Sequence, residues 1–340
     1  MKTDRLPSGN YRVRVTWTDA AGEHSKSFTA STATEAKKNA AAFRATLGDV
    51  PDATDITLKD ALNGYIAMKR NVLSPSTVRE YESTARLYFD RLKFCRVSEI
   101  TPVMVQKEIS DLSSRLAPKT VRNAYGLLTA TLKMYRPAFN PACRLPQRSP
   151  SRIEIPSADE VKAIIDKLDG NDAKLAVMLA AYQGLRISEI AALRWSDINM
   201  DKQTLTVCGA VVLGSEHAYV AKAPKTRAGH RTVRILSPVM DELKKRDPTK
   251  GNIFDITPTA IRNRYRRALR SLDLKYTFHE LRHYACSVML SLGIPPKYVA
   301  DALGHEGTNM VDKVYGHIMK SAADAYSERL NQFYESGGKI

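Results

Sequence analysis

Apolar and polar residues alternate along the beginning of the chain. Residues 11–18 place an apolar side chain at every odd position and a polar one at every even position. A period of two predicts a strand with one buried face. Residues 19–22 then predict a turn, and residues 24–29 a returning strand. An alanine-rich stretch, which we expect Thr34 to cap, predicts a helix that runs to about Thr46.

A helical pattern follows a short linker at residues 48–55. Between residues 57 and 135 apolar side chains recur every three or four positions, which predicts a compact four-helix domain. The first helix carries this spacing at Leu58, Leu62, Tyr65, Ile66 and Met68. Proline stands near the first turn of the other three helices, where its missing N–H costs least, at Pro75, Pro102 and Pro118.

A stretch dense in proline extends from residue 136 to residue 157, with Arg144, Arg148 and Arg152 between the prolines. Proline lacks a backbone donor and does not continue a helix. We therefore expect this stretch to resist packing and to connect two domains in an extended form.

The last and largest unit mixes helices with short strands. Ser157 and Glu160 have the spacing of a capping box, which predicts a helix to about Leu168. The periodicity predicts further helices over 173–182, 187–193, 257–272 and from 278 onward, and strands over 205–213, 219–223 and 232–236.

These patterns predict a multidomain α+β protein. It would hold a small N-terminal β-sheet plus helix, an all-α four-helix domain, and a mainly α domain with a small antiparallel sheet. We place these domains at residues 1–47, 56–136 and 157–340, with a linker at 137–156.

The charge of the chain indicates a polyanionic partner. Lys and Arg number 52 against 36 Asp and Glu, a net charge of +16. The excess is spread over the whole chain, which favours nucleic acid over anionic lipid. Arg12 and Arg14 share the polar face of the first strand, which is either an ordinary solvated face or a DNA contact. Arg144 and Arg148 are further candidate DNA-binding residues.

The composition excludes several classes of protein. Hydrophobic residues make up 43% and charged residues 26%, which suits packed cores rather than a disordered chain. Apolar runs stay far below the roughly 20 residues of a membrane-spanning helix, and the N-terminus shows no secretory signal. Four scattered cysteines predict neither a disulfide framework nor a cysteine zinc site. We expect a cytoplasmic protein.

Two clusters of candidate chemistry precede residue 230. Arg186 follows the helix-breaking Gly184 at the start of a new helix, a place that suits an anionic phosphate oxygen. Glu189 shares its helix face, so the two also fit a plain surface ion pair. Lys225 lies between two predicted strands, where a lysine reaches a neighbouring site or is merely solvated, and Lys222 is its rival.

A third cluster begins at His279. His279 and Arg282 share a helix face, so the arginine could bind a phosphate oxygen while the histidine moves a proton. The same string spells H-E-x-x-H, in which His279 and His283 would bind zinc and Glu280 would be the general base. That alternative needs a third ligand, for which only residues 305–306 are available, and it places a guanidinium beside a dication.

The fourth cluster joins His305, which follows a glycine, to Tyr315, ten residues later, in a Val-Tyr-Gly-His setting. Tyr298 and Tyr326 are rival tyrosines without that setting. Taken alone, Tyr315 also fits a half-buried aromatic.

The order of these clusters resembles the tyrosine recombinase (phage integrase) family over residues 157–340. The string from Gly184 through Arg186 and Glu189 continues into Ala-Leu-Arg-Trp-Ser-Asp-Ile, as the first box of that family does. The four-helix domain resembles the core-binding domain of the family. The N-terminal sheet plus helix is similar to the arm-type DNA-binding domain of integrases from phages and conjugative transposons.

The resemblance implies a role for each clustered residue. Tyr315 would attack a scissile DNA phosphate and form a 3′-phosphotyrosyl link. His279 would assist with its proton, and Lys225 would be the general acid for the departing 5′-oxygen. Arg186 and Arg282 would stabilise the charge of the transition state. His305 would orient the phosphate, and neither a metal nor ATP would be required as a cofactor.

The resemblance also implies partners. These are double-stranded DNA at core and arm sites, other copies of the chain in a homotetramer, an excision factor and a host DNA-bending protein, but no membrane. The protein would integrate and excise a mobile element or prophage at the nucleoid of a bacterial host. A helix over residues 322–333 would dock either in cis or on the neighbouring subunit.

Three alternatives stay open from the sequence. A type IB topoisomerase uses the same chemistry without strand exchange. A DNA-binding protein could keep the fold without catalysis, and the third alternative is the zinc protease.

Overall fold

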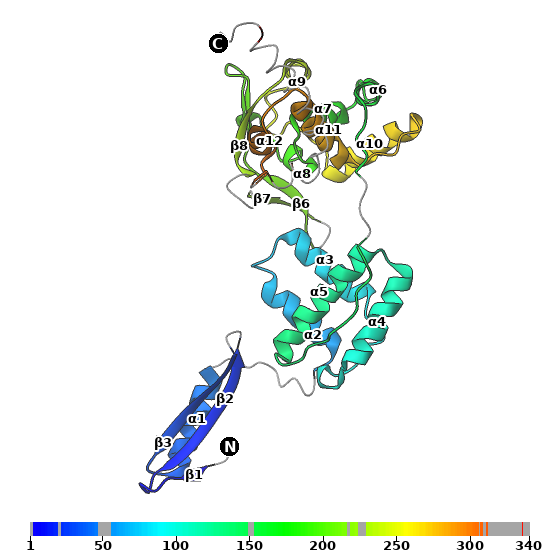
Figure 1. Ribbon diagram of the computed structural model, residues 1–340. Helices are drawn as coiled ribbons and strands as arrows, with labels where there is room; N and C mark the ends of the chain where they lie inside the picture. The colour runs from blue at the N-terminus through cyan, green and yellow to red at the C-terminus, as the bar shows by residue number, and fades with distance from the viewer. Residues whose placement is uncertain are drawn as a thin grey trace. The chain divides into compact units, whose positions relative to one another are not determined.

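The computed structural model is a multidomain α+β protein (Figure 1). It describes residues 3–19, 22–46, 56–148, 153–215, 218–223, 229–305, 307–308, 311 and 335. The chain forms two compact units, Met1–Pro150 and Ser151–Ile340. Within the described residues, no helix has both the length and the apolar character needed to cross a membrane.

The first unit opens with an antiparallel sheet backed by one helix. Strand β2 (Tyr11–Asp19) pairs with β3 (Gly22–Ala30), as the alternation predicts, and the two-residue strand β1 (Asp4–Arg5) adds an edge. Helix α1 (Ala33–Thr46) covers one face of this sheet. The buried residues between them are Val13, Val15, Ala36 and Ala40.

The predicted cap of α1 is wrong by two positions. The backbone N–H of Glu35 donates to the hydroxyl of Thr32, 3.2 Å away. A capping hydroxyl must lie two or three residues before the amide that it accepts from. Thr32 meets this condition for Glu35, whereas Thr34 already lies within the helix.

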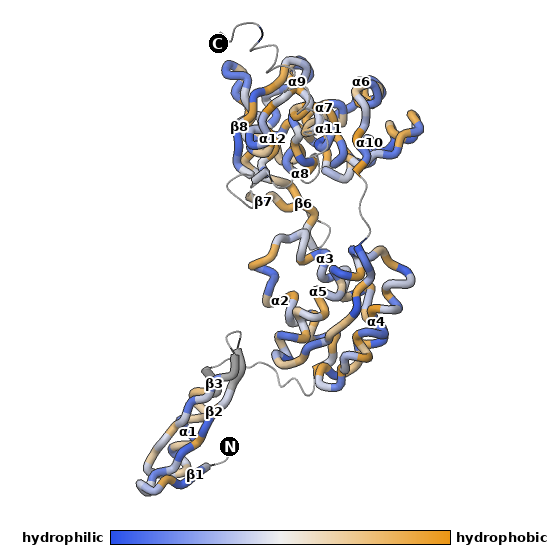
Figure 2. The backbone as a smooth tube through the Cα atoms, viewed as in Figure 1, coloured by the Kyte–Doolittle hydropathy of each residue, from blue (hydrophilic) through white to orange (hydrophobic). Residues whose placement is uncertain are grey.

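The second part of this unit is a bundle of four helices. They are α2 (Leu58–Lys69), α3 (Pro75–Leu87), α4 (Pro102–Arg115) and α5 (Pro118–Tyr135). The last three each start at the predicted proline, and apolar and polar stretches alternate along the bundle (Figure 2). Met68 is exposed rather than part of the apolar face, because it lies two residues, about 200° of helix rotation, after the buried Ile66.

Residues 136–148 of the proline-dense stretch pack, contrary to expectation. Residues 136–148 form no helix or strand, yet side chains of α4 and α5 bind their backbone. The hydroxyl of Tyr125 donates to the carbonyl of Pro141 at 2.6 Å, and the Arg122 guanidinium donates to the carbonyl of Pro146 at 2.8 Å. An extended chain leaves its carbonyl groups unpaired, so helix side chains can satisfy them.

The second unit is built around α7 (Ala173–Gln183), which is buried along almost its whole length. The other helices are α6 (Ala158–Lys167), α8 (Ile187–Ile190), α9 (Ser237–Leu243), α10 (Pro258–Ser271), α11 (Phe278–Ser291) and α12 (Pro296–Leu303). The predicted helix over 187–193 ends at Ile190, because the following residues turn to pair with the segment around residue 252. Helix α9 is too short to give a periodic signal.

Within the described residues, the strands of this unit form two sheets. They are β4 (Ile198–Asn199), β5 (Thr204–Val207), β6 (Ala210–Leu213), β7 (Tyr219–Lys222) and β8 (Arg231–Arg234). One sheet has the order β4-β5-β8 and the other pairs β6 with β7. The single strand predicted over 205–213 is therefore wrong. It breaks beside Gly209, where an added Cβ would lie 3.1 Å from the carbonyl oxygen of Lys222.

Replacing Gly184 with alanine should destabilise the second unit. Gly184 ends α7 at φ +68°, and an added Cβ would lie 2.1 Å from the buried side chain of Leu303. We expect G184A to lower the free energy of unfolding by about 2–4 kcal/mol in urea titrations. Gly170, at φ +66° with open space around it, is the matched control. Equal losses in G184A and G170A would contradict the predicted clash.

Candidate active site

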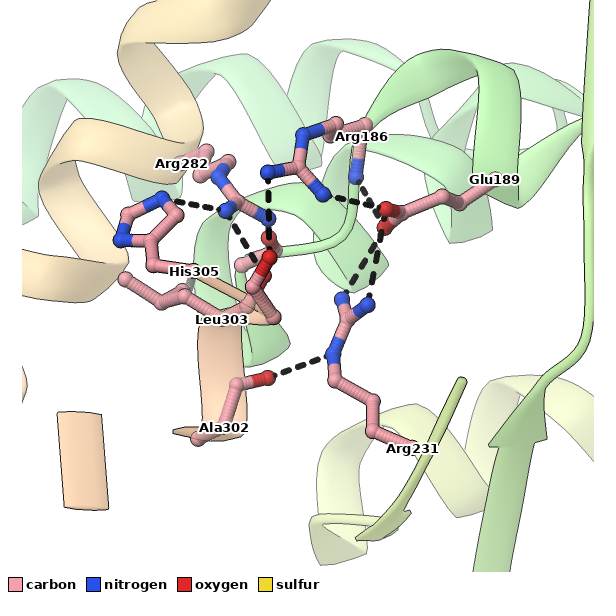
Figure 3. A network of polar contacts seen from close by, with 9 residues as sticks. Arg186, Glu189, Arg231, Arg282, Ala302, Leu303 and His305 are labelled. Carbon is pink, nitrogen blue, oxygen red and sulfur yellow. Dashed lines mark hydrogen bonds and ion pairs between the residues drawn. The ribbon is translucent and has the colours of Figure 1, made fainter. Parts of the chain in front are cut away.

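Arg186 lies where the chain leaves α7 and enters α8. Gly184 closes α7 in the left-handed conformation, and Arg186 becomes the residue that precedes α8. Its guanidinium donates to one carboxylate oxygen of Glu189 at 2.6 Å, and its backbone N–H donates to the other at 3.0 Å (Figure 3). The side chain is 36% exposed. Glu189 therefore fixes the arginine while leaving it accessible to a ligand.

Arg282 is almost fully buried on α11, with 3% of its surface exposed. Its guanidinium donates to the carbonyls of Gly184 at 2.6 Å and Leu303 at 2.7 Å. It also lies 2.7 Å from Nε2 of His305 (Figure 3). One buried cation thus joins the end of α7 to the end of α12.

Glu280 caps the start of α11. The backbone N–H of Thr277 donates to the carboxylate of Glu280 at 2.5 Å. Glu280 is thus engaged in the cap rather than directed at the rings of His279 and His283, whose centroids are 4.9 Å apart. Among the described residues, no group of three or more His, Cys, Asp or Glu side chains could hold a metal ion.

His305 follows Gly304, which closes α12 in the left-handed conformation. A guanidinium only donates, so Nε2 of His305 must accept from Arg282 and the proton must lie on Nδ1. Nδ1 is buried and has no hydrogen-bond partner among the described residues. The contact with Arg282 therefore sets both the tautomer and the orientation of this ring.

The site is dominated by positive charge. Burial, and then the charge of Arg186, lowers the pKa of Arg282 to about 9. Desolvation and neighbouring cationic groups lower the pKa of His279 and that of His305 to about 4. Burial raises the pKa of Glu189, but hydrogen bonds and the charges of Arg231 and Arg186 outweigh it, so the net shift is downward. At neutral pH the arginines are charged and both imidazoles are neutral.

This arrangement can hold an anion. Arg186 and His279 line one pocket of about 470 Å³, together with Arg262 and Arg266, which lie one turn apart on α10. Guanidinium groups and a neutral imidazole in one pocket suit a phosphate that gains charge during a reaction. The neutral imidazole can accept a proton from a nucleophile.

Some of the other predicted residues lie within the described part of the chain and others lie outside it. Lys225 and Tyr315 lie outside the described residues, as does the rival Tyr326. Lys222 lies at the end of β7, and Tyr298 lies on α12 with 66% of its surface exposed. The candidate DNA-binding residues that follow α5, Arg144 and Arg148, and those on β2, Arg12 and Arg14, belong to the first unit.

Arg231 belongs to this network although it was not predicted from the sequence. It lies on β8, 8% exposed, and binds Glu189 (Figure 3). The alternation of residues along the strand carries a signal for it. Residues 231, 233 and 235 share one face, and the latter two are Val233 and Ile235. An arginine on an apolar strand face needs a buried carboxylate partner.

Comparison with known proteins places these residues in a family context. Residues 156–322 match the sequence model of the phage integrase family. The chain is 24% identical to a tyrosine recombinase XerC-like protein of Caldanaerobacter subterraneus subsp. tengcongensis, over 98% of this chain and 99% of that protein.

Two solved structures show the fold. The Tn1549 transposon integrase, in complex with circular intermediate DNA, matches 81% of this chain and 100% of that chain, with 20% identity and a TM-score of 0.68. The lambda integrase tetramer bound to a Holliday junction matches 90% of this chain and 96% of that chain, with 17% identity and a TM-score of 0.56.

The low pKa of His305 predicts a pH dependence of stability. Its folded pKa of about 4 lies below the ordinary 6.5, so the unfolded chain binds more protons between these values. The free energy of unfolding should therefore fall as pH drops from 6.5 to 4. In His305→Gln the amide oxygen can still accept from Arg282, and the slope near pH 5 should shrink by up to about 1.4 kcal/mol per pH unit.

Urea titrations at several pH values measure this slope. An identical slope in the wild type and in His305→Gln would show that His305 titrates normally in the folded protein.

Proposed function

The chain belongs to the phage integrase family of tyrosine recombinases, and we propose from this that it integrates and excises a mobile DNA element by site-specific recombination. The observation that carries the proposal is the joining of Arg186, Arg282 and His305 around one buried hydrogen-bond network, with His279 beside it. These residues come from three segments of the chain: the start of α8, helix α11 and the residue after Gly304.

The network leaves donors for a phosphate. Three N–H groups of Arg282 bind protein acceptors, and a guanidinium carries five. Arg186 donates to Glu189 and, at 3.4 Å, to the carbonyl of Gly304. Remaining donors on both arginines would bind the non-bridging oxygens of a scissile DNA phosphate, where fixed cations stabilise the added charge of a pentavalent transition state.

The covalent steps are assigned to residues outside the described ones. Tyr315 would attack the phosphate and form the 3′-phosphotyrosyl link, while Lys225 would protonate the departing 5′-oxygen. A tyrosine has a pKa of about 10 and needs a base. His279 suits this role because it is neutral at pH 7. Religation would restore the phosphodiester and release the tyrosine, so ATP would not be required. Because the arginines would supply the positive charge, a metal would not be required either.

The basic surfaces support DNA binding by both units. Helix α10 carries exposed or half-exposed arginines, namely Arg262, Arg264, Arg266, Arg267 and Arg270. In the first unit, Arg12 pairs across the sheet with Thr29 and Arg14 with Ser27, on the face opposite the buried valines that contact α1. This uncovered sheet face would bind arm-site DNA.

We assign the parts of the chain accordingly. Residues 1–47 would be the arm-type domain, 56–136 the core-binding domain, 137–156 the connection and 157–340 the catalytic domain. Exposed Arg144 and Arg148 would add phosphate contacts beside the bundle. Because lambda integrase forms a tetramer on a Holliday junction, we propose a homotetramer on DNA. An excision factor and a host DNA-bending protein would act as accessory proteins.

Loss of the Tyr315 hydroxyl should abolish covalent attachment to DNA. The substrate is a nicked duplex from the DNA that flanks the gene. After cleavage the short fragment diffuses away, so religation is prevented and the covalent adduct accumulates. We expect denaturing gels to show a DNA adduct for the wild type and none for Tyr315→Phe, with binding changed by less than about threefold because one hydroxyl is a small part of the interface. Tyr298→Phe is the control, and an adduct in Tyr315→Phe would refute the assignment.

Removing one cation from the open sheet face should weaken salt-dependent DNA binding. Each phosphate contact contributes about −0.9 to the slope of log K against log salt concentration. We expect Arg14→Gln to reduce this slope by about 0.9 for the full chain on a generic duplex. Lys38→Gln removes the same charge from the exposed side of α1 and should leave the slope unchanged. Equal slopes for wild type and Arg14→Gln would exclude this surface.

A further inference from the structure

Arg231 forms a buried ion pair beside the proposed catalytic arginines. It is the first residue of β8, and its guanidinium donates to both carboxylate oxygens of Glu189, at 3.0 and 3.5 Å. Its Nε donates to the carbonyl of Ala302 at 2.7 Å (Figure 3). Both partners of the pair are less than 10% exposed, so water screens this interaction weakly.

These contacts link Arg231 to both arginines of the site. Glu189, its first partner, also holds the guanidinium and the backbone N–H of Arg186. Ala302, its second partner, directly precedes Leu303, whose carbonyl binds Arg282. Arg231 itself binds the carboxylate and the helix end from the side of β8, and it is absent from the lining of the pocket that Arg186 and His279 share.

We propose that Arg231 is a positioning residue for DNA strand cleavage. It neutralises the Glu189 carboxylate, so that the charge of Arg186 remains available to the scissile phosphate, and it holds the end of α12 that carries His305. This inference rests on the proposed recombinase function.

The charges explain why the pair matters. Arg186, Arg231 and Glu189 together carry a net charge of +1, so an approaching phosphate meets a positive site. Without Arg231, Glu189 and Arg186 would form a neutral pair, and the carboxylate would lie close to the developing negative charge. Removing that carboxylate charge as well would return the net charge to +1. A purely structural role for Arg231 would give no such recovery.

The test compares cleavage rates of nicked duplex from the flanking DNA at saturating concentration. We expect Arg231→Met to cleave about tenfold to a hundredfold more slowly, with DNA affinity changed less than about threefold. Arg231→Lys keeps the positive charge but loses the planar guanidinium that binds both carboxylate oxygens. Its cleavage rate should therefore lie between those of the wild type and Arg231→Met. Arg231→Met combined with Glu189→Gln should cleave at least about fivefold faster than Arg231→Met.

Arg234→Met is the matched control, because it removes an exposed arginine from the same strand. It should cleave at the wild-type rate. A wild-type rate in Arg231→Met, or a double variant no faster than that single variant, would overturn the inference while leaving the recombinase function intact. An absence of adduct with the wild type itself would overturn the proposed function and this inference with it.

Discussion

The second unit depends on one buried guanidinium. Arg282 is 3% exposed, and a charge so far from water is tolerated only when its donors are bound. Its partners are the carbonyls of Gly184 and Leu303 and the ring of His305. The ends of α7 and α12 must therefore meet beside α11, and each of these helices closes on a left-handed glycine, Gly184 or Gly304. The contacts of Arg282 thus both hold these helix ends together and position the residues of the proposed site.

The network around Arg282 is unbalanced in charge. The network holds three guanidinium groups, and Glu189 pairs with two of them, Arg186 and Arg231. The histidines stay neutral because their pKa values are lowered to about 4, so the network keeps an excess of positive charge that a DNA phosphate would offset in part. The bound phosphate would in turn favour the protonated form of each imidazole. Proton movement and phosphate binding would be coupled in this way.

Local structure could be predicted from the sequence, whereas most of the site could not. Period and proline position located the helices that begin at Pro75, Pro102 and Pro118, and the capping box at Ser157. The break between β5 and β6 was missed, because it depends on a partner strand distant in sequence. The candidate residues themselves were selected by a resemblance, since each was ambiguous alone. The contacts of Arg282 with both helix ends, and of Arg231 with Glu189, arise from long-range packing that no local period encodes.

The proposed mechanism requires this cluster and one tyrosine to act on a single DNA phosphate. Mass spectrometry of the protein after cleavage, with the DNA digested to a short stub, identifies the attached residue and the polarity of the link. We expect a nucleotide joined through its 3′-phosphate to the peptide that contains Tyr315, and a free 5′-hydroxyl on the released strand. A nucleotide on Tyr298 or any other residue, or a link through a 5′-phosphate, would contradict it.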